Sequence, residues 1–330
     1  MRAATITAHG RAPEVLDRGD PLPAEGRLVV AVTAVPITPL DLLCASGTSY
    51  FGPPALPYVP GVQAVGVVRH GPAELVGRRV WFPTSAGMAP GDGGMAELAV
   101  ASAAEAVVVE ADLPDVFVAA LGLSAVAAWE VLEARAALRP GETVLVLGAG
   151  GVVGQVALQA ARLLGAGRVV AAARSALARE RAAACGADAV VEVGDDDDVT
   201  SLAERLRSAC GGEVDVVVDP LAGIPGSAAA RVLASGGRLV NLGSSAGTAV
   251  SVDSAVLRSH SAAVLGYTNT SLTDARRRAV FATVLGHAAA GRIDVTHTRV
   301  PLHAAPAAWD EVAAGRAPHR VVVTPQDLES

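Results

Sequence analysis

A glycine-rich turn at residues 148–154, reading Gly-Ala-Gly-Gly-Val-Val-Gly, most constrains the fold of this chain. An apolar run at 143–147 precedes the turn, and residues 155–164 after it have helical periodicity. A strand, a glycine turn and a helix in this order are typical of a dinucleotide-binding site. Glycines let the backbone approach a pyrophosphate, and N–H groups at the start of the helix favour its charge.

The spacing is Gly-x-x-Gly-x-x-Gly rather than Gly-x-Gly-x-x-Gly, so the motif needs support from its surroundings. The residues predicted to bind the cofactor here are Gly148, Gly151, Val152, Val153 and Gly154.

The segments after residue 142 alternate between strand and helix. This alternation predicts an α/β domain with a parallel sheet covered by helices on both faces, the Rossmann-type doubly wound arrangement. The predicted strands are 143–148, 168–173, 189–193, 214–219, 238–242 and 262–267. The predicted helices are 152–164, 176–185, 199–210 and 227–235.

Residues 1 to about 115 differ, because short β-like runs such as 28–32 and 65–68 are separated by Pro/Gly breaks. This pattern predicts a compact β domain. After about residue 290 the elements are short again, with a strand near 297–301, a helix near 304–314 and a strand at 320–324. A chain of 330 residues is long enough for two domains with substantial cores.

Composition narrows the range of partners and chemistry. The chain is 51% hydrophobic and 18% charged, as in globular proteins, and its net charge of −7 with no basic block argues against nucleic acid and anionic membranes. We find no transmembrane-length apolar run and no signal peptide, so a cytoplasmic location is expected. There is no lysine, which excludes Schiff-base chemistry, and the three cysteines are too few for a disulfide framework. The acidic run 195–198 is interpreted as a solvated loop that complements the dipole of the next helix.

The end of the second strand of the alternating region indicates which cofactor is bound. In NAD-binding versions of this fold, an Asp or Glu at this point bonds the ribose 2′-hydroxyl. Here the strand ends in Arg174-Ser175, twenty positions after Gly154. A guanidinium and a hydroxyl suit a 2′-phosphate, because arginine binds phosphate bidentately and stays charged. The sequence therefore predicts NADPH as the cofactor.

On these motifs the chain resembles the zinc-independent quinone oxidoreductase branch of the medium-chain dehydrogenase/reductases, over nearly its whole length. The segments that carry the resemblance, besides the glycine turn, are 38–41, 45–47, 56–61, 93–97, 140–145, 236–243 and 321–325. The resemblance implies a GroES-like catalytic domain at 1–117, completed by 270–330, and an NADP(H)-binding domain at 118–269. It also implies an active site in the cleft between the domains and a homodimer that pairs through the last strand, near 262–265.

The resemblance also bears on metal binding. At the positions where the zinc-dependent alcohol dehydrogenases of this superfamily hold catalytic zinc, this chain has Thr38, Val62-Gln63 and Leu123. Valine and leucine cannot ligate a metal and threonine is a poor zinc ligand. Residues 84–94 contain no cysteine for a structural zinc lobe. We therefore expect no metal, and hydride transfer to an electron-poor acceptor such as a quinone or an α,β-unsaturated carbonyl compound.

Further site residues follow from the resemblance. The candidate catalytic residues are Thr38, Asp41 and Tyr50. Thr38 stands where related enzymes usually have an Asn in the nicotinamide pocket. Asp41 matches the family's aspartate, although we expect it to fix the loop by capping hydrogen bonds. Tyr50 borders the substrate cleft, where its phenol either stacks on a quinone or simply packs; Tyr58 is expected to be structural. Residues expected at the cofactor are Gly243, Ser244, Ser245, Tyr267 and Arg320, although strand-end packing for Tyr267 and solvent exposure for Arg320 are alternatives.

Three other functions are suggested by parts of the sequence: a hydrolase, a cofactor-binding protein and a dedicated reductase. Residues 243–247 match the Gly-x-Ser-x-Gly of hydrolases, but the helix that must follow the serine is replaced by an alternating, strand-like stretch at 248–253. A cofactor-binding protein with little turnover remains an alternative, because one fold hosts many functions. A dedicated ene- or imine-reductase of a biosynthetic pathway is another.

Overall fold

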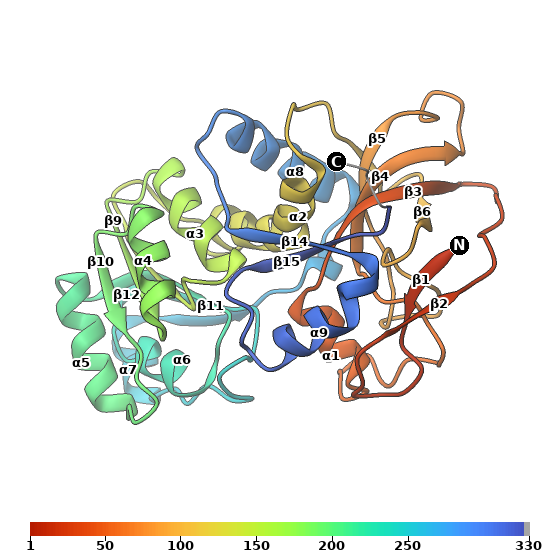
Figure 1. Cartoon of the computed structure of the whole chain (residues 1–330). Coiled ribbons are helices and arrows are strands. Elements are labelled where there is room, and N and C mark those ends of the chain that lie inside the picture. Colours follow the sequence, from red (N-terminus) through yellow and green to blue (C-terminus); the bar gives the residue numbers. More distant parts are fainter. Residues whose placement is uncertain (327–330) are drawn as a thin grey trace. The chain divides into compact units, whose positions relative to one another are not determined.

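The computed structural model describes residues 1–326, which form two compact units (Figure 1). Unit 1 contains Met1–Leu123, Asp274–Ala289 and the residues from Val295 onward. Unit 2 contains Ser124–Thr273 and Ala290–Asp294. The sequence predicts boundaries at 117/118 and 269/270, whereas the chain passes between the units after Leu123 and after Thr273.

A six-stranded, wholly parallel sheet forms the centre of unit 2, in the order β10-β9-β8-β11-β12-β13. The strands are β8 (Thr143–Leu147), β9 (Arg168–Ala173), β10 (Ala189–Glu192), β11 (Val214–Asp219), β12 (Leu233–Asn241) and β13 (Ala263–Gly266). The helices are α3 (Val152–Leu163), α4 (Ala176–Ala184), α5 (Val199–Cys210), α6 (Gly223–Ala230) and α7 (Ser254–His260), with the 3-10 turn η2 (Asn269–Ser271) after β13. The predicted Rossmann-type doubly wound sheet is confirmed.

Both faces of this sheet are buried. Leu145 and Leu147 of β8 pack with Leu202 and Leu206 of α5 in one core cluster. Val146, which lies between them along the strand, points to the opposite face and is equally inaccessible to solvent. Burial on both faces explains why the strands read as continuous apolar runs rather than as alternating patterns.

Unit 1 is built on a seven-stranded sheet in the order β14-β15-β3-β4-β5-β7, with β6 also paired to β3. The strands are β3 (Arg27–Pro36), β4 (Gln63–His70), β5 (Arg79–Pro83), β6 (Leu98–Ser102), β7 (Val107–Val108), β14 (His297–Pro301) and β15 (Arg320–Thr324); β1 (Arg2–Thr5) and β2 (Glu14–Asp17) form a separate antiparallel pair. The helices are α1 (Pro39–Ala45), α8 (Asp274–Ala289) and α9 (Ala305–Ala313), with the 3-10 turn η3 (Leu302–Ala304). Because β15 lies antiparallel to β3, the last strand of the chain completes a sheet begun by its first segment.

Three stretches differ from the sequence predictions. The helix expected at 227–235 ends at Ala230, because Leu233 already pairs with Val214 ahead of an irregular, glycine-containing stretch of β12. Residues 248–253 form a loop rather than a strand-like stretch. Helix α8, which the sequence analysis did not predict, is anchored in unit 1 by Phe281, whose ring centroid lies 4.3 Å from that of Trp81.

Helix α2 (Asp115–Glu130) continues into a π-helical turn, η1 (Val131–Arg135), and is interrupted at Gly122 (φ 37°, ψ −137°). Over residues 1–326 this stretch, Asp115–Arg135, is long and apolar enough to cross a membrane, but 78% of its most apolar window is buried inside the protein. A core helix of a folded domain has these same properties.

We predict that all three thiols are unreactive in the folded protein. Burial raises the pKa of Cys44, Cys185 and Cys210 to about 11. At pH 7.5, fewer than about one in a thousand molecules therefore carries a given cysteine as thiolate. Titration with a disulfide reagent should give almost no fast reaction in buffer and three equivalents in denaturant. A fast equivalent in buffer would contradict this assignment.

We predict that Gly66→Ala lowers the free energy of unfolding by about 3 kcal/mol, because the added methyl has no room. A Cβ on Gly66 would overlap the Ala31 carbonyl oxygen and lie 2.7 Å from Val30 Cγ1, and the β3–β4 pairing holds both in place. The control is Gly19→Ala, where a Cβ meets nothing within 4 Å. Denaturant unfolding measures the free energy of unfolding of both variants. Equal values for Gly66→Ala and Gly19→Ala would contradict the prediction, because they would mean that β4 shifts to make room for the methyl group at no cost.

Candidate functional site

The glycine turn lies where the connection of the sheet reverses. From β8 the chain continues outward to β9 and β10, and it then crosses back to place β11 on the other side of β8. In open parallel sheets, ligands bind outside the carboxyl ends of the strands at such a switch point. Gly148, which follows β8, has φ +60°, and a Cβ there would lie 3.0 Å from Leu221 Cδ2, after β11. The turn therefore occupies the position where this fold binds ligands.

The start of α3 is open to an anion. Its N-cap residue, Gly151, has no side chain to accept a hydrogen bond, and a Cβ there would meet only the Gly148 carbonyl oxygen, at 3.5 Å. The helices α1, α4, α5 and α7 are each capped by a side chain, from Thr38, Ser175, Asp198 and Asp253. The first N–H groups of a helix have no intrahelical acceptor, so those of Val152, Val153 and Gly154 suit a phosphate.

Two further residues shape the turn, and the sequence analysis did not assign them a role. A side chain on Gly150 would collide with Ala178 of α4. Gln155 is buried and its Nε2 donates to the Gly150 carbonyl oxygen at 2.9 Å. The third glycine of the motif, Gly154, packs so closely that a Cβ would lie 2.5 Å from Ala149 Cα. The helix is thus held against the strand by contacts that only glycine permits.

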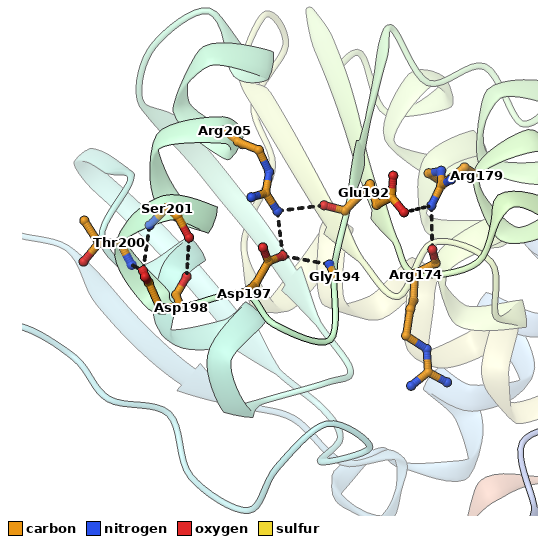
Figure 2. Close-up of polar contacts among 9 residues, drawn as sticks. All are labelled: Arg174, Arg179, Glu192, Gly194, Asp197, Asp198, Thr200, Ser201 and Arg205. Atoms are coloured by element: carbon orange, nitrogen blue, oxygen red, sulfur yellow. Dashed lines mark hydrogen bonds and ion pairs between the residues drawn. The ribbon is translucent and has the colours of Figure 1, made fainter.

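Arg174 and Ser175 follow β9, as predicted. The Arg174 side chain is 74% exposed, and its Nη1 lies 3.7 Å from Asp195 Oδ1. Figure 2 shows the Arg179 guanidinium between the Arg174 carbonyl oxygen, at 2.6 Å, and Glu192 Oε1, at 3.0 Å. Ser175 Oγ accepts from Ala178 N, which leaves its O–H as a donor.

Residues after β12 and β13 lie at the same edge of the sheet, because parallel strands share their carboxyl ends. Gly243 has no space for a Cβ, which would lie 2.5 Å from the Pro220 carbonyl oxygen. Ser244 and Ser245 follow it in the loop, and Ser245 Oγ donates to that same carbonyl at 3.2 Å. After β13, the Tyr267 hydroxyl donates to Asn269 Oδ1 at 2.7 Å.

A hydrogen-bonded pair of one buried and one partly buried residue, which the sequence did not predict, supports this edge. Asp219, at the end of β11, is fully buried, and its Oδ2 accepts from Asn241 Nδ2 at 2.9 Å. Asn241 Nδ2 also donates to the Gly243 carbonyl oxygen at 2.9 Å. The pair therefore fixes the loop that carries Ser244 and Ser245.

In unit 1, Asp41 organises the residues matched to the catalytic region. Its carboxylate accepts from Thr38 N at 2.9 Å, Thr38 Oγ1 at 2.6 Å, and from the backbone N–H groups of Gly61 and Val62 at 2.9 Å. Burial raises the pKa of Asp41, and these four hydrogen bonds oppose the rise. The single hydroxyl proton of Thr38 is thereby committed to Asp41, and the carboxylate joins the start of α1 to the 60–62 loop.

Two of the residues that the resemblance places at zinc-ligand positions, Gln63 and Leu123, are joined by a hydrogen bond within the protein. Gln63 is 1% exposed, and its Oε1 accepts from Trp81 Nε1 at 3.0 Å and from Leu123 N at 2.6 Å. A side chain on Gly122 would collide with this amide, which explains the break in α2. Among residues 1–326, no three His, Cys, Asp or Glu side chains are grouped so as to hold a metal ion.

The remaining candidates from unit 1 have different environments. Tyr50 is 76% exposed, with its ring against Phe51, whereas Tyr58 is 4% exposed and has a buried hydroxyl. Arg320, in β15, donates from Nη1 to the Ile37 carbonyl oxygen at 2.9 Å. Burial lowers the pKa of Arg320 to about 10, against the opposing charge of Asp41. These contacts account for Arg320 within unit 1, and its predicted role at the adenosine phosphate stays a prediction.

The hydrolase alternative lacks its required local structure. A turn and a loop follow Ser245, and the next helix, α7, begins only at Ser254. A nucleophile elbow needs a helix directly after the serine. The Gly-x-Ser-x-Gly match is therefore a coincidence of composition.

Comparison with known proteins agrees with this geometry. Residues 152–286 match the family model described as zinc-binding dehydrogenase. The chain is 31% identical over 257 residues to the quinone oxidoreductase of Lama guanicoe, and the match covers 74% of this chain and 73% of that one.

Solved structures extend the likeness to both units. A mycobacterial protein in complex with NADPH has a TM-score of 0.86 at 26% identity, covering 98% of this chain and 100% of that one. The quinone oxidoreductase of Thermus thermophilus, also solved with NADPH, has a TM-score of 0.82 at 28% identity, covering 98% and 100%. The chain belongs to the medium-chain dehydrogenase/reductase family, as an oxidoreductase of the quinone oxidoreductase type.

Proposed function

We propose that this protein uses NADPH to reduce a quinone or another α,β-unsaturated carbonyl compound without a metal ion. The observation that carries the proposal is the uncapped start of α3 beside β9, a strand that is followed by Arg174-Ser175 instead of an acid. NADPH, when bound, supplies a hydride from C4 of its nicotinamide; the acceptor takes this hydride and a proton from solvent or a donor group, leaving NADP⁺ and the reduced acceptor.

The residues of unit 2 fit such a cofactor. The N–H groups of Val152, Val153 and Gly154 suit its pyrophosphate, because the start of the helix has partial positive charge and no competing cap. The exposed Arg174 guanidinium suits a 2′-phosphate, which it binds bidentately. Ser244, Ser245 and Tyr267 are the residues we assign to the nicotinamide ribose and amide. The NADPH complexes of two similar structures support this choice.

The residues of unit 1 favour an acceptor that needs no Lewis acid. Val62 offers no ligand, and the Thr38 hydroxyl and the Gln63 amide oxygen are occupied by hydrogen bonds within the protein. An acceptor that is already electron-poor accepts hydride without further polarisation, and its developing oxygen charge is stabilised by hydrogen-bond donors. Tyr50, which is 76% exposed, is the aromatic residue we assign to acceptor binding.

We also propose a homodimer that forms through β13. Within residues 1–326, this edge strand pairs only with β12, and Val264 on it is 40% exposed. An unpaired strand edge is a template for pairing with a second copy.

We predict that Arg174→Asp weakens NADPH binding at least tenfold, in line with the loss of about 1.4 kcal/mol or more from a charged hydrogen-bond pair, and leaves NADH binding almost unchanged. The reason is that only NADPH has the 2′-phosphate. Calorimetric titration of both cofactors measures the difference. Arg258→Asp, an equal change of charge at an exposed position of α7, is the control. Equal losses for the two cofactors would refute the phosphate assignment.

We predict that chelator treatment leaves turnover unchanged. Protein dialysed against a strong chelator should oxidise NADPH with quinones and enones at the untreated rate, and elemental analysis should find no stoichiometric zinc. One tightly held zinc ion per chain would overturn the metal-free mechanism.

The range of acceptors distinguishes the alternative functions. Activity confined to one class of enone or imine would favour a dedicated reductase, and NADPH binding without turnover on any acceptor would favour a binding protein.

A further inference from the structure

The acidic run at 195–198 divides into residues with separate contacts. Asp198 caps α5, with Oδ1 accepting from Thr200 N at 2.7 Å and Ser201 N at 2.8 Å (Figure 2). Asp197 Oδ2 accepts from Gly194 N at 2.8 Å and Arg205 Nη2 at 2.6 Å. These two carboxylates therefore serve the loop and the helix, as the sequence analysis supposed for the whole run.

Asp195 has a different partner. Its Oδ1 lies 3.7 Å from Arg174 Nη1, and the two side chains are 84% and 74% exposed. At that distance the contact is an ion pair without a hydrogen bond, so an incoming anion can displace the carboxylate. The Gly194–Asp197 bond closes the loop around Asp195 and keeps this residue beside the end of β9.

Arg179, whose guanidinium contacts the Arg174 carbonyl oxygen, is already paired. Arg179 binds Glu192 and the Arg174 carbonyl oxygen, so its charge is neutralised locally and its position is fixed (Figure 2). Arg174 is therefore the cation available to a 2′-phosphate, and in the absence of cofactor Asp195 is its counter-ion. A phosphate monoester carries nearly two negative charges at neutral pH, so it competes with the single charge of Asp195 for the Arg174 guanidinium.

We propose that Asp195 is a specificity-determining residue, the counter-ion that the cofactor's 2′-phosphate must displace from Arg174, and that it thereby weakens the preference for NADPH over NADH. This inference rests on the proposed function, since it requires Arg174 to bind the 2′-phosphate. Asp195 lies twenty-one positions beyond Arg174 in sequence, outside the motif that predicted the cofactor.

The test is cofactor binding to the full chain, measured by calorimetry with NADPH and NADH at low ionic strength and at about 0.5 M salt. Asp195→Asn should tighten NADPH binding about threefold at low ionic strength, the size expected for an exposed charge pair, and should leave NADH unchanged. The gain should shrink in high salt. Asp196→Asn, which removes the same charge from the neighbouring exposed carboxylate, is the matched control and should behave like the unmodified protein.

A second pair of variants separates competition from simple repulsion. In an Arg174→Gln background, Asp195→Asn should give no gain, because there is no longer a guanidinium to release. A gain of the same size in that background, or an Asp195→Asn variant that matches Asp196→Asn, would overturn the inference while a selective NADPH loss in Arg174→Gln still supports the proposed function. If Arg174→Gln keeps the full NADPH preference, the phosphate assignment and the inference both fail.

Discussion

Contact of backbone against backbone at the first turn of α3 is the constraint on which unit 2 depends. Gly154 lies so near Ala149 that any side chain would separate helix from strand. Gly151, in the same turn, leaves α3 without a side-chain cap. The first N–H groups of α3 therefore lack the hydrogen bonds that the side chains of Ser175 and Asp198 accept at the starts of α4 and α5. A tight helix–strand contact and an unsatisfied set of N–H groups thus arise from one run of glycines. Sequence reasoning reaches both because glycine spacing records them directly.

In unit 1 the residues at the metal-ligand positions form a hydrogen-bonded framework of their own. Asp41 gathers four donors from α1 and the 60–62 loop, and Gln63 joins β5 to the break in α2. Buried polar groups need partners, and here the Asp41 carboxylate and the Gln63 amide oxygen obtain them from backbone and side-chain donors of unit 1. These oxygens therefore have structural roles within the unit.

The sequence predicted the parallel sheet well, because buried strands are continuous apolar runs and most helices have a clear cap or periodic face. It failed where long-range contacts decide local structure. Strand β12 begins before Gly236 and Gly237 because Leu233 pairs with Val214 of β11. Helix α8 is held in place because Phe281 packs against Trp81 of β5, which lies much earlier in the sequence. The candidate site divides in the same way. The glycines and Arg174 lie in recognisable local patterns, whereas Asn241 and Asp195 take their roles from neighbours that only the folded chain brings near.

The position of β15 has a consequence for synthesis of the protein. Strand β3 is made within the first 36 residues, but β15, which pairs with it, is residues 320–324. All of unit 2 lies between them in sequence and contains every strand of its own sheet. During synthesis, all six strands of the unit 2 sheet therefore leave the ribosome while β3 of unit 1 still lacks its neighbour β15. Since domains generally fold as units and unpaired edges invite aggregation, the interval before residue 320 is when the growing chain is most exposed to misassembly.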